Sequence, residues 1–376
     1  MPAKSLKIGL IGAGRIGCLH AEHLTSRIPS TPKGGMADLI MVADVFEDAA
    51  RECVERYGIP HAMKDYRAVL DRSDIQAVVI CSPTGTHAQI IEEAAQAGKH
   101  IFCEKPISLD LASIDRALDT VARAGVKLQI GFNRRFDANY RRVRQAVEQE
   151  EIGRPYLLHI ISRDPAPPPI EYIRVSGGIF LDMTIHDFDM ARFLIGSEVE
   201  EIFVQTAVMD DPAIGEAGDV DTAFILLQFS NGVIGTISNS RRAAYGYDQR
   251  VELLGSAGVI STENNYPNTA IISDCRSVRR DLPLNFFLER YTESYISEMA
   301  NFVDAVVYDR PVLVTGFDGR VPVVMALAAR KSLLEHRPVR LSEIEDQGQP
   351  CALQGLVPST DELLEHQPTR LSEIEQ

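Results

Sequence analysis

A glycine-rich turn close to the N-terminus constrains the fold of this chain more than any other feature. The apolar run Lys7–Ile11 leads directly into Gly12, Gly14 and Gly17, spaced as G-x-G-x-x-G, and a helical pattern follows. In such a turn the first glycine allows the sharp bend, the second lets a pyrophosphate approach the backbone, and the third permits close packing of helix against sheet. The N–H groups at the start of the helix would then hold the phosphates. This spacing predicts a dinucleotide site.

Up to about residue 130, short apolar runs alternate with helical patterns. Helices are clearest over Ala88–Ala97 and Leu111–Ala124. Alternation of this kind is typical of a parallel sheet covered on both faces. We therefore predict an α/β fold whose residues 1–130 form a Rossmann dinucleotide-binding domain. Its predicted strands are Lys7–Ile11, Leu39–Ala43, Ala77–Cys81, His100–Cys103 and Lys127–Ile130.

After Gly131 the pattern changes to longer strands, and Asn231-Gly232 supplies a hairpin turn between two of them. This part, residues 131–345, is predicted to be a C-terminal α+β domain for substrate binding and oligomerisation, built on a large open, mostly antiparallel sheet. Its predicted strands are Tyr156–Ser162, Glu201–Val208, Thr222–Phe229, Val233–Ser238 and Arg250–Leu254. A C-terminal extension, residues 346–376, repeats Leu333–Glu345 as Leu363–Glu375. It is either a mobile tail or a segment that reaches a neighbouring subunit.

Composition excludes several classes of protein. A length of 376 residues favours two domains. The net charge of −15 argues against a nucleic-acid partner, whose phosphates would be repelled. No apolar run is long enough to span a bilayer, and a strand begins too early to leave room for a signal peptide. The six cysteines lack paired spacing, so we expect reduced, buried thiols in the cytoplasm. No cluster has metal-ligand spacing, and no metal is expected.

Asp44 closes the second predicted strand, Leu39–Ala43. A carboxylate there accepts hydrogen bonds from ribose hydroxyls and repels a 2′-phosphate, which favours NAD over NADP. Ser82 and Thr84 follow the third strand, at the sheet edge where ligands of open α/β sheets bind, and are expected near the ribose or nicotinamide. His87 is interpreted either as a helix-start residue or as a cofactor contact. The full predicted set of cofactor contacts is Gly12, Gly14, Arg15, Ile16, Asp44, Ser82, Thr84, His87 and Glu104.

Three residues are candidates for catalysis. Asp182 and His186 are four apart in a predicted helix that runs from Gly178 to Gly196, so they should project from the same face. Lys105 follows an apolar strand and should emerge beside the nicotinamide. The hypothesis is that His186 takes the proton of a substrate hydroxyl during hydride transfer, because a histidine pKa suits general-base work. Lys105 would stabilise the alkoxide charge, and Asp182 would fix the geometry.

These residues lie in longer motifs. Through these motifs the chain resembles the glucose–fructose oxidoreductase/inositol dehydrogenase/rhizopine-catabolism (Gfo/Idh/MocA) family over residues 5–345. Within the family, it is most similar to the inositol dehydrogenases. The motifs are Gly12–Gly17 with His20, Cys81–Thr84 with His87, Glu104-Lys105-Pro106, Gly131–Asp137, Ser162–Pro165, Ser176–Gly178 and Asp182–Arg192. The resemblance implies a cyclic polyol substrate, NAD and a homotetramer built through the second-domain sheets. It also implies substrate contacts at Asn133, Arg135, Arg163, Asp164, Tyr172, Tyr245 and Tyr291, whereas Arg134, Arg141 and Arg142 are interpreted as a solvated helix face.

Three functions remain open at this point. The first is NAD-dependent oxidation of myo- or scyllo-inositol to an inosose. The second is a related pyranose dehydrogenase that acts on glucose-like sugars, because a six-membered ring with equatorial hydroxyls fits either description. The third is a nucleotide-sensing regulator without chemistry, which should have lost Lys105, Asp182 or His186; all three are present.

Overall fold

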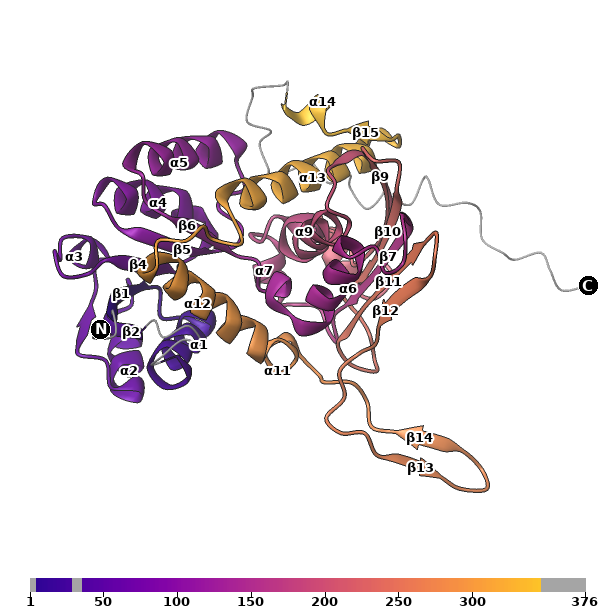
Figure 1. The fold of residues 1–376 in the computed structure, drawn as a ribbon, viewed down its shortest axis with the longest axis horizontal. Helices are drawn as coiled ribbons and strands as arrows, with labels where there is room; N and C mark the ends of the chain where they lie inside the picture. The colour runs from indigo at the N-terminus through magenta and orange to yellow at the C-terminus, as the bar shows by residue number, and fades with distance from the viewer. Residues whose placement is uncertain (1–4, 29–35, 346–376) are drawn as a thin grey trace, which may run out of the picture.

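The computed structural model describes residues 5–28 and 36–345, which fold around two sheets (Figure 1). The first sheet is parallel throughout, in the order β3-β2-β1-β4-β5-β6. Its strands are β1 (Ser5–Ile11), β2 (Met36–Ala43), β3 (His61–Met63), β4 (Ala77–Ile80), β5 (His100–Glu104) and β6 (Leu128–Gly131). The helices of this region are α1 (Arg15–Glu22), η1 (His23–Arg27), α2 (Glu47–Tyr57), α3 (Arg67–Leu70), η2 (Thr84–Thr86), α4 (His87–Gln96) and α5 (Leu111–Ala124).

Both faces of this sheet are buried, which explains the apolar runs in the sequence. Along β4, Val78 and Ile80 belong to one hydrophobic cluster, whereas Ala77 and Val79 belong to the other. All four side chains are fully buried. The predicted Rossmann domain architecture is confirmed, and each predicted strand of this sheet lies within three residues of an observed one at both ends.

The second sheet has the order β12-β11-β7-β10-β9-β8-β15, and its neighbours are antiparallel except for the parallel pair β7 and β10. The prediction of a mostly antiparallel sheet is therefore confirmed, including the turn at Gly232, whose φ of +85° suits glycine. Its strands are β7 (Pro155–Arg163), β8 (Val199–Ala207), β9 (Thr222–Phe229), β10 (Ile234–Ser240), β11 (Asp248–Gly255), β12 (Val259–Thr262) and β15 (Val339–Arg340), and a separate ribbon pairs β13 (Ile271–Ser273) with β14 (Val278–Arg280).

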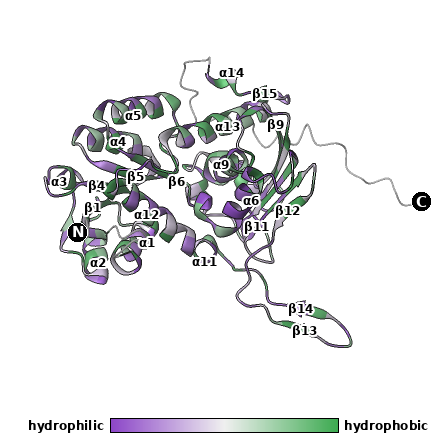
Figure 2. Ribbon diagram, viewed as in Figure 1, coloured by the Kyte–Doolittle hydropathy of each residue, from purple (hydrophilic) through white to green (hydrophobic). Residues whose placement is uncertain are grey.

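Helices cover one face of the second sheet and leave the other open (Figures 1 and 2). The covering helices include α6 (Ala138–Glu148), α9 (Thr184–Ile195) and α13 (Gly316–Glu335), which contact β12, β7 and β8 respectively. The remaining helical segments of this half are η3 (Asn133–Phe136), α7 (Ile170–Ile173), α8 (Gly178–Asp182), α10 (Pro212–Glu216), α11 (Phe287–Arg290), α12 (Thr292–Val307) and α14 (Ser342–Glu345). The sheet therefore has an apolar core on its covered side only.

Two late helices return to the first sheet. The helix α12 packs against β1 and η1, and α13 contacts both β6 on the first sheet and β8 on the second. The side chains of Met299, Phe302 and Val303 from α12 complete a hydrophobic cluster under β1 and β2. The division of the chain at residue 130 stays a prediction, but these helices tie the two sheets together.

The predicted helix from Gly178 to Gly196 is wrong in one respect. The structure divides it into α8 and α9 at Met183, so Asp182 ends one helix and His186 lies in the first turn of the next. The apolar side chains of this segment are nevertheless buried, and Leu181, Ile185 and Phe188 all face the core. Within the described residues, no helix is both long and apolar enough to cross a membrane. The predicted C-terminal extension and the duplicated segment Leu363–Glu375 lie outside those residues.

Candidate active site

The turn between β1 and α1 has the shape that a pyrophosphate requires. Gly12 has a φ of +99°, and a Cβ there would lie 2.6 Å from the backbone of Cys81 and Ser82. A Cβ on Gly17 would lie 1.9 Å from the carbonyl oxygen of Gly12. At Gly14, by contrast, a Cβ would meet nothing within 4 Å, which leaves the backbone open to a ligand. Each glycine therefore has the environment that the spacing predicts.

Asp44 follows β2 and lies beside this turn. Its Oδ2 accepts a hydrogen bond from the N–H of Ala13 at 2.7 Å, and its Oδ1 accepts one from the N–H of Phe46 at 2.8 Å. These bonds fix a half-buried carboxylate at the rim of the nucleotide site, where a ribose would lie. Arg15 is exposed on the first turn of α1, with its guanidinium near the rings of Phe286 and Phe287, and Ile16 is half-buried next to it.

The loop after β4 carries the predicted contacts Ser82, Thr84 and His87. Ser82 and Thr84 are both half-buried, and the hydroxyls of Ser82 and Thr86 are 2.7 Å apart. His87 is buried, and its two ring nitrogens lie 2.8 Å from the carbonyl oxygen of Pro106 and 2.7 Å from that of Ser82. Both nitrogens are therefore engaged by backbone. Of the two interpretations of His87, the structure favours a structural residue that begins α4 and ties two loops together.

Lys105 follows β5 and points toward the end of α8. Its Nζ donates a hydrogen bond to the carbonyl oxygen of Asp182 at 3.1 Å. Burial lowers the pKa of this lysine, and the carboxylates of Asp182 and Glu104 oppose that shift. The side chain of Asp182 is held on both oxygens, because Oδ1 accepts from the hydroxyl of Tyr172 at 3.0 Å and Oδ2 accepts from Nη1 of Arg241 at 3.1 Å.

His186 lies on α9, edge-on to the ring of Phe132 with the centroids 6.0 Å apart. Its Nδ1 is buried without a hydrogen-bond partner among the described residues. Burial, followed by the nearby positive charges of Lys105 and Arg134, lowers the pKa of His186 well below its usual value. The imidazole is therefore neutral at pH 7 and able to accept a proton. Lys105, Asp182 and His186 come together, as the sequence predicts.

A positioning element that sequence reasoning missed lies behind Asp182. Arg241 is buried, and its second amino group donates to Oδ2 of Asp219 at 3.2 Å. Oδ1 of Asp219 accepts the N–H of Ile179 at 2.9 Å, in the first turn of α8. Arg241 and Asp219 thus fasten both ends of the short helix that carries Asp182. The sequence gives no sign of this arrangement of Arg241 and Asp219, which we call the clamp. Arg241 follows the last residue of β10, and its two partners come from other segments of the chain.

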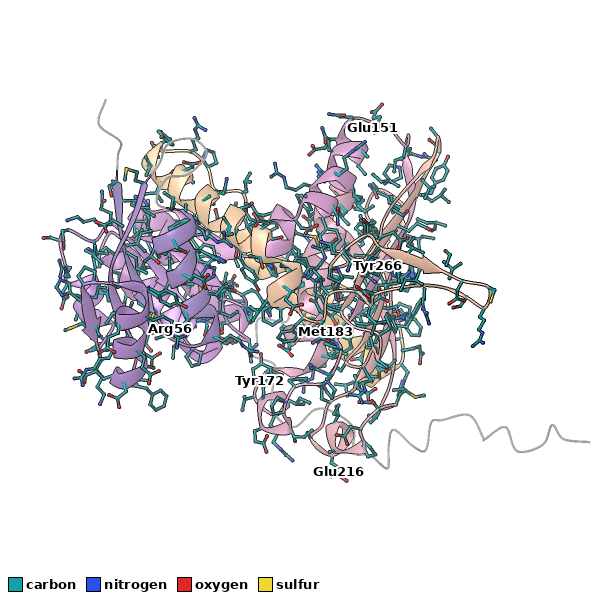
Figure 3. All side chains as sticks on the ribbon, turned by 90° about the horizontal axis from the view of Figure 1, so that it is seen from below. Arg56, Glu151, Tyr172, Met183, Glu216 and Tyr266 are labelled. Carbon is teal, nitrogen blue, oxygen red and sulfur yellow. The ribbon has the colours of Figure 1, made fainter. Side chains whose placement is uncertain are left out.

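Several predicted substrate contacts lie around the three catalytic candidates. Burial is the largest of the influences that raise the pKa of Asp164 to about 6, and the adjacent Asp182 acts in the same direction. The hydroxyl of Tyr245 accepts from Nη1 of Arg163 at 3.0 Å and donates to Asp248 at 2.5 Å. Tyr172 is 49% exposed next to Asp182, and Figure 3 shows it on the side of the second half of the molecule that faces the first sheet. These groups supply both donors and acceptors.

Other predicted contacts have a different role in the structure. The guanidinium of Arg135 is paired with Asp189 at 2.6 Å and Asp318 at 2.9 Å, an arrangement that joins η3 to α9 and α13. Tyr291 is only 2% exposed, and its ring lies 4.6 Å from the guanidinium carbon of Arg290. Both are therefore better explained as packing residues than as substrate contacts. Asn133 is buried, and its amide nitrogen lacks a partner among the described residues, so it remains a candidate.

The interpretation of three arginines as a solvated helix face is wrong for one of them. Arg134 is buried, and its Nη1 donates to Oδ1 of Asp187 at 2.6 Å. Arg141 and Arg142 are exposed, as predicted. The charge of Arg134 thus contributes to the electrostatics of the site, where it helps to lower the pKa of His186.

Glu104, one of the predicted cofactor contacts, takes part in a buried cluster. Its Oε1 lies 2.8 Å from Nε2 of His20, and the ligand atoms of His20, Glu104 and Glu298 all lie within 4.8 Å of one another. Glu298 is fully buried, and neither carboxyl oxygen has a partner among the described residues. Burial and the charge of Glu104 raise the pKa of Glu298 well above its usual value. Protonation of Glu298 removes the negative charge that a metal would otherwise balance, and the absence of a metal stays a prediction.

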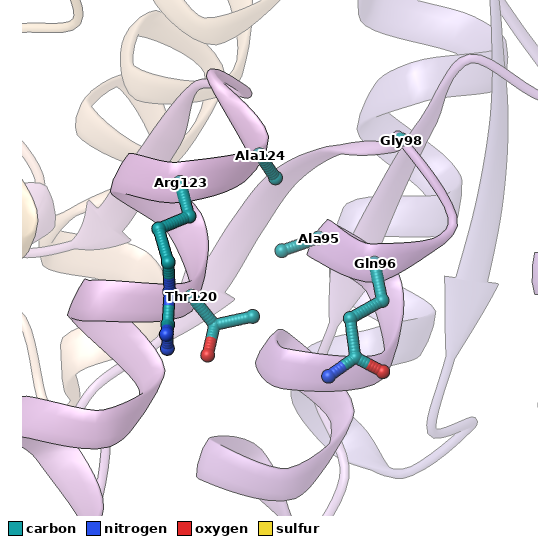
Figure 4. A pocket seen from close by; sticks show the side chains of 6 residues that line it. All are labelled: Ala95, Gln96, Gly98, Thr120, Arg123 and Ala124. Carbon is teal, nitrogen blue, oxygen red and sulfur yellow. The ribbon is translucent and has the colours of Figure 1, made fainter.

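A surface hollow of about 500 Å³ lies between α4 and α5 (Figure 4). It is lined by Ala95, Gln96, Gly98, Thr120, Arg123 and Ala124. Gly98 precedes β5, so this hollow is at the opposite edge of the sheet from Lys105. It is not part of the site described above.

The structure describes five of the six cysteines, all as free thiols. Four of them are buried or half-buried, as expected: Cys18, Cys53, Cys81 and Cys103. Cys275 is exposed, contrary to the expectation of buried thiols.

The site lies where the neighbouring strands of a parallel sheet end. Gly12 follows β1, Ser82 follows β4 and Lys105 follows β5, and these strands are adjacent in the sheet. Ligands of open α/β sheets bind at this edge. A phosphate-binding turn next to a neutral histidine and a buried lysine defines a nicotinamide-dependent oxidoreductase.

Comparison with known proteins agrees with this class. Residues 6–132 match the model of the oxidoreductase family with the NAD-binding Rossmann fold, and residues 140–261 match the GFO/IDH/MocA C-terminal domain. The chain therefore belongs to the Gfo/Idh/MocA family of oxidoreductases.

Similar proteins include inositol dehydrogenases from several bacteria. The chain is 48% identical to the myo-inositol 2-dehydrogenase of Thermotoga maritima over 90% of this chain and 99% of that one. It is 44% identical to the inositol 2-dehydrogenase of Rhizobium meliloti, over 90% of this chain and 100% of the other. The crystal structure of scyllo-inositol dehydrogenase from Lactobacillus casei, with bound NAD(H) and scyllo-inositol, matches with a TM-score of 0.83 at 31% identity, covering 90% of this chain and all of that one.

Proposed function

We propose that this protein oxidises one ring hydroxyl of a cyclic polyol, myo- or scyllo-inositol, to the corresponding inosose with NAD. The observation that carries the proposal is the meeting of Lys105, Asp182 and a neutral His186 at the cofactor edge of the parallel sheet. The similarity to the inositol dehydrogenases of Thermotoga maritima and Rhizobium meliloti supports the choice of substrate.

The residues of the nucleotide site fit NAD. The backbone at Gly14 is open, the turn at Gly12 is tight, and Asp44 offers a carboxylate to a ribose. Bound NAD supplies the hydride acceptor for the reaction. Because Asp44 would repel a 2′-phosphate, the site should prefer NAD to NADP.

The chain's own residues move the proton. Nε2 of His186 accepts the proton of the substrate hydroxyl, because Nδ1 is enclosed and the ring is neutral. The ammonium of Lys105 donates a hydrogen bond to the same oxygen and stabilises the negative charge that develops there. Asp182 positions Lys105, since its backbone carbonyl accepts a hydrogen bond from the ammonium and its carboxylate is held by Tyr172 and Arg241.

Recognition of a polyol requires many paired donors and acceptors, because each hydroxyl that leaves water must be bonded again. Asp164, Arg163, Tyr245 and Tyr172 provide such groups. The amide nitrogen of Asn133, which has no partner in the described part of the chain, provides another donor. An apolar substrate would leave these groups unsatisfied. The density of polar side chains therefore supports a ring that carries a hydroxyl on most carbons.

A substrate panel tests the proposal. The purified protein is mixed with NAD and either myo-inositol, scyllo-inositol or glucose, and NADH is followed by its absorbance. We expect the highest kcat/KM with an inositol. A higher value with glucose would favour the pyranose dehydrogenase, and NAD binding without turnover on any ring would favour a regulator. His186→Ala serves as the matched inactive control.

We also propose that the enzyme is a cytoplasmic homotetramer assembled through the open face of the second sheet. That face exposes Phe224, Leu226, Ile234 and Leu254, each at least 39% accessible. An apolar patch on a sheet commonly marks a subunit interface. Light scattering measures the mass of the purified protein in solution. The mass of a monomer would contradict the proposed tetramer without affecting the catalytic proposal.

A further inference from the structure

A two-stranded arm, residues 266–284, projects from the body of the molecule. It contains β13 and β14, which pair in antiparallel register with Ile271 opposite Arg280 and Ser273 opposite Val278. Every residue from 267 to 282 is exposed. Figures 1 and 3 show the arm extending past the side of the second sheet that carries no helix. Nothing in the proposed reaction uses it.

The arm exposes several large apolar side chains to solvent. Ile271, Ile272, Val278 and Leu282 are between 57% and 73% exposed. A two-stranded hairpin alone is at best marginally stable in water, and it also offers unpaired strand edges to other chains. A ribbon of this composition therefore gains stability when another surface covers it.

We propose that the arm docks on a second copy of this chain. Its charge supports that occupant, because the arm carries three arginines and two aspartates within a chain of net charge −15. Only Arg279 forms an ion pair with an aspartate of the arm, Asp274 at 3.4 Å. Among the described residues no carboxylate pairs with Arg276 or Arg280. Arg280 instead donates to the hydroxyl of Tyr266 and lies over its ring, so Arg276 is the arginine most available to an acidic partner.

The direction of the arm supports the same occupant. The open face of the second sheet exposes Phe224 and Leu226, and the arm extends beyond that face. A second copy seated on the open face would lie within reach of the arm. The inference thus deepens the proposed assembly, because it adds a second and separate contact to the one made by the sheet.

The residues that flank the arm on both sides contact residues of the proposed active site. On the entering side, Nδ2 of Asn264 donates to Oδ1 of Asp248 at 2.7 Å, and Asp248 accepts the hydroxyl of Tyr245. On the leaving side, the rings of Phe286 and Phe287 lie about 6 Å from the guanidinium of Arg15 at the nucleotide turn. Docking of the arm would therefore hold the substrate side and the cofactor side of the site together. Assembly and substrate affinity should be linked.

The test uses the full chain with Ile272→Asp and Val278→Asp combined, which places charge on the docked ribbon without touching the body. Met209→Asp is the matched control, because Met209 is 74% exposed and lies outside both the arm and the sheet. Mass is measured by light scattering across a dilution series. We expect the arm variant to dissociate at a concentration at least tenfold higher than wild type and control, with raised KM values for polyol and NAD at high dilution.

Unchanged mass in the arm variant at every concentration would overturn the proposal. Leu226→Asp, on the open face, separates the two contacts. If only Leu226→Asp dissociates the assembly, the sheet contact stands and the arm contact is wrong. A charge-reversed pair, Arg276→Glu with Arg280→Glu, should also weaken assembly, and should do so less at high salt. An arm variant that keeps its mass but loses binding to RNA or to anionic vesicles would assign the arm to a different partner.

Discussion

Replacement of Asp164 by asparagine should remove an acid limb from the pH profile of kcat/KM. Asp164 follows β7, next to Asp182 in the proposed site, and its pKa is about 6. Burial raises this pKa and the charge of Asp182 adds to the effect, whereas Arg241 and Arg134 oppose it. If the ionised carboxylate accepts hydrogen bonds from the substrate, catalysis should follow its ionisation.

The pKa of Asp164 sets the expected size of the fall in kcat/KM at low pH. With a pKa of about 6, the carboxyl is roughly nine-tenths ionised at pH 7 and about one-tenth ionised at pH 5. Between these values kcat/KM for an inositol should fall about tenfold. His186 does not produce this limb, because its pKa lies well below 6.5 and the ring stays neutral over most of the range.

The assay is the initial rate of NADH formation at low substrate concentration, in overlapping buffers of constant ionic strength from pH 5 to 8. Asp164→Asn should lose about tenfold or more at pH 7, because a hydrogen bond to a charged group contributes about 1.5–3 kcal/mol. The remaining kcat/KM of Asp164→Asn should not vary between pH 5 and 8. Asp65→Asn, an exposed carboxyl elsewhere on the surface, should keep the wild-type profile. An acid limb that persists in Asp164→Asn with the same midpoint would refute the reasoning.

Four further predictions follow from the same geometry. His186→Ala should lower kcat by about 10²–10⁴ while NAD still binds, as measured by fluorescence titration, and a variant with most of its turnover would remove His186 from this role. Asp44→Ser should narrow the difference between NAD and NADP affinities, and equal affinities in the wild type would contradict the role of this carboxylate. Arg241→Met should destabilise the fold by about 3–5 kcal/mol in urea, because it leaves buried carboxylates unpaired, and a loss below about 1 kcal/mol would contradict the clamp. Since burial raises the pKa of Glu298 above 4.5, wild type should lose stability relative to Glu298→Gln as the pH rises from 5 to 8; a difference independent of pH would show that Glu298 is not protonated.

The backbone of the first half was predictable because its physical causes are local. The helix α5 begins and ends at its predicted residues, since Asp110 caps its first turn and Gly125 ends it in the left-handed region. The strand β3 was missed, because His61–Met63 is short and mostly exposed and has no apolar run. The ribbon of β13 and β14 was missed as well, because a strand with no buried face has no alternation in its sequence.

The residue types of the site were predictable, but the direction of several side chains was not. The partners of Arg135 are 54 and 183 residues away in the sequence, and only the packing of η3 against α9 and α13 brings them together. Arg241 was missed for the same reason, because its partners Asp182 and Asp219 come from two other segments. Motif spacing identifies which groups can do chemistry, whereas long-range packing decides which of them face the substrate.

One physical cause gives the two proton-handling residues opposite roles. Burial lowers the pKa of both Lys105 and His186, from ordinary values of 10.5 and 6.5. The lysine begins four units higher, and the carboxylates of Asp182 and Glu104 help to keep it charged. The histidine has no such carboxylate among the groups that shift its pKa, and the charge of Lys105 pushes it further toward the neutral form. The same enclosed site therefore holds a charged donor beside a neutral acceptor at pH 7, which is the pairing that removal of a hydroxyl proton requires.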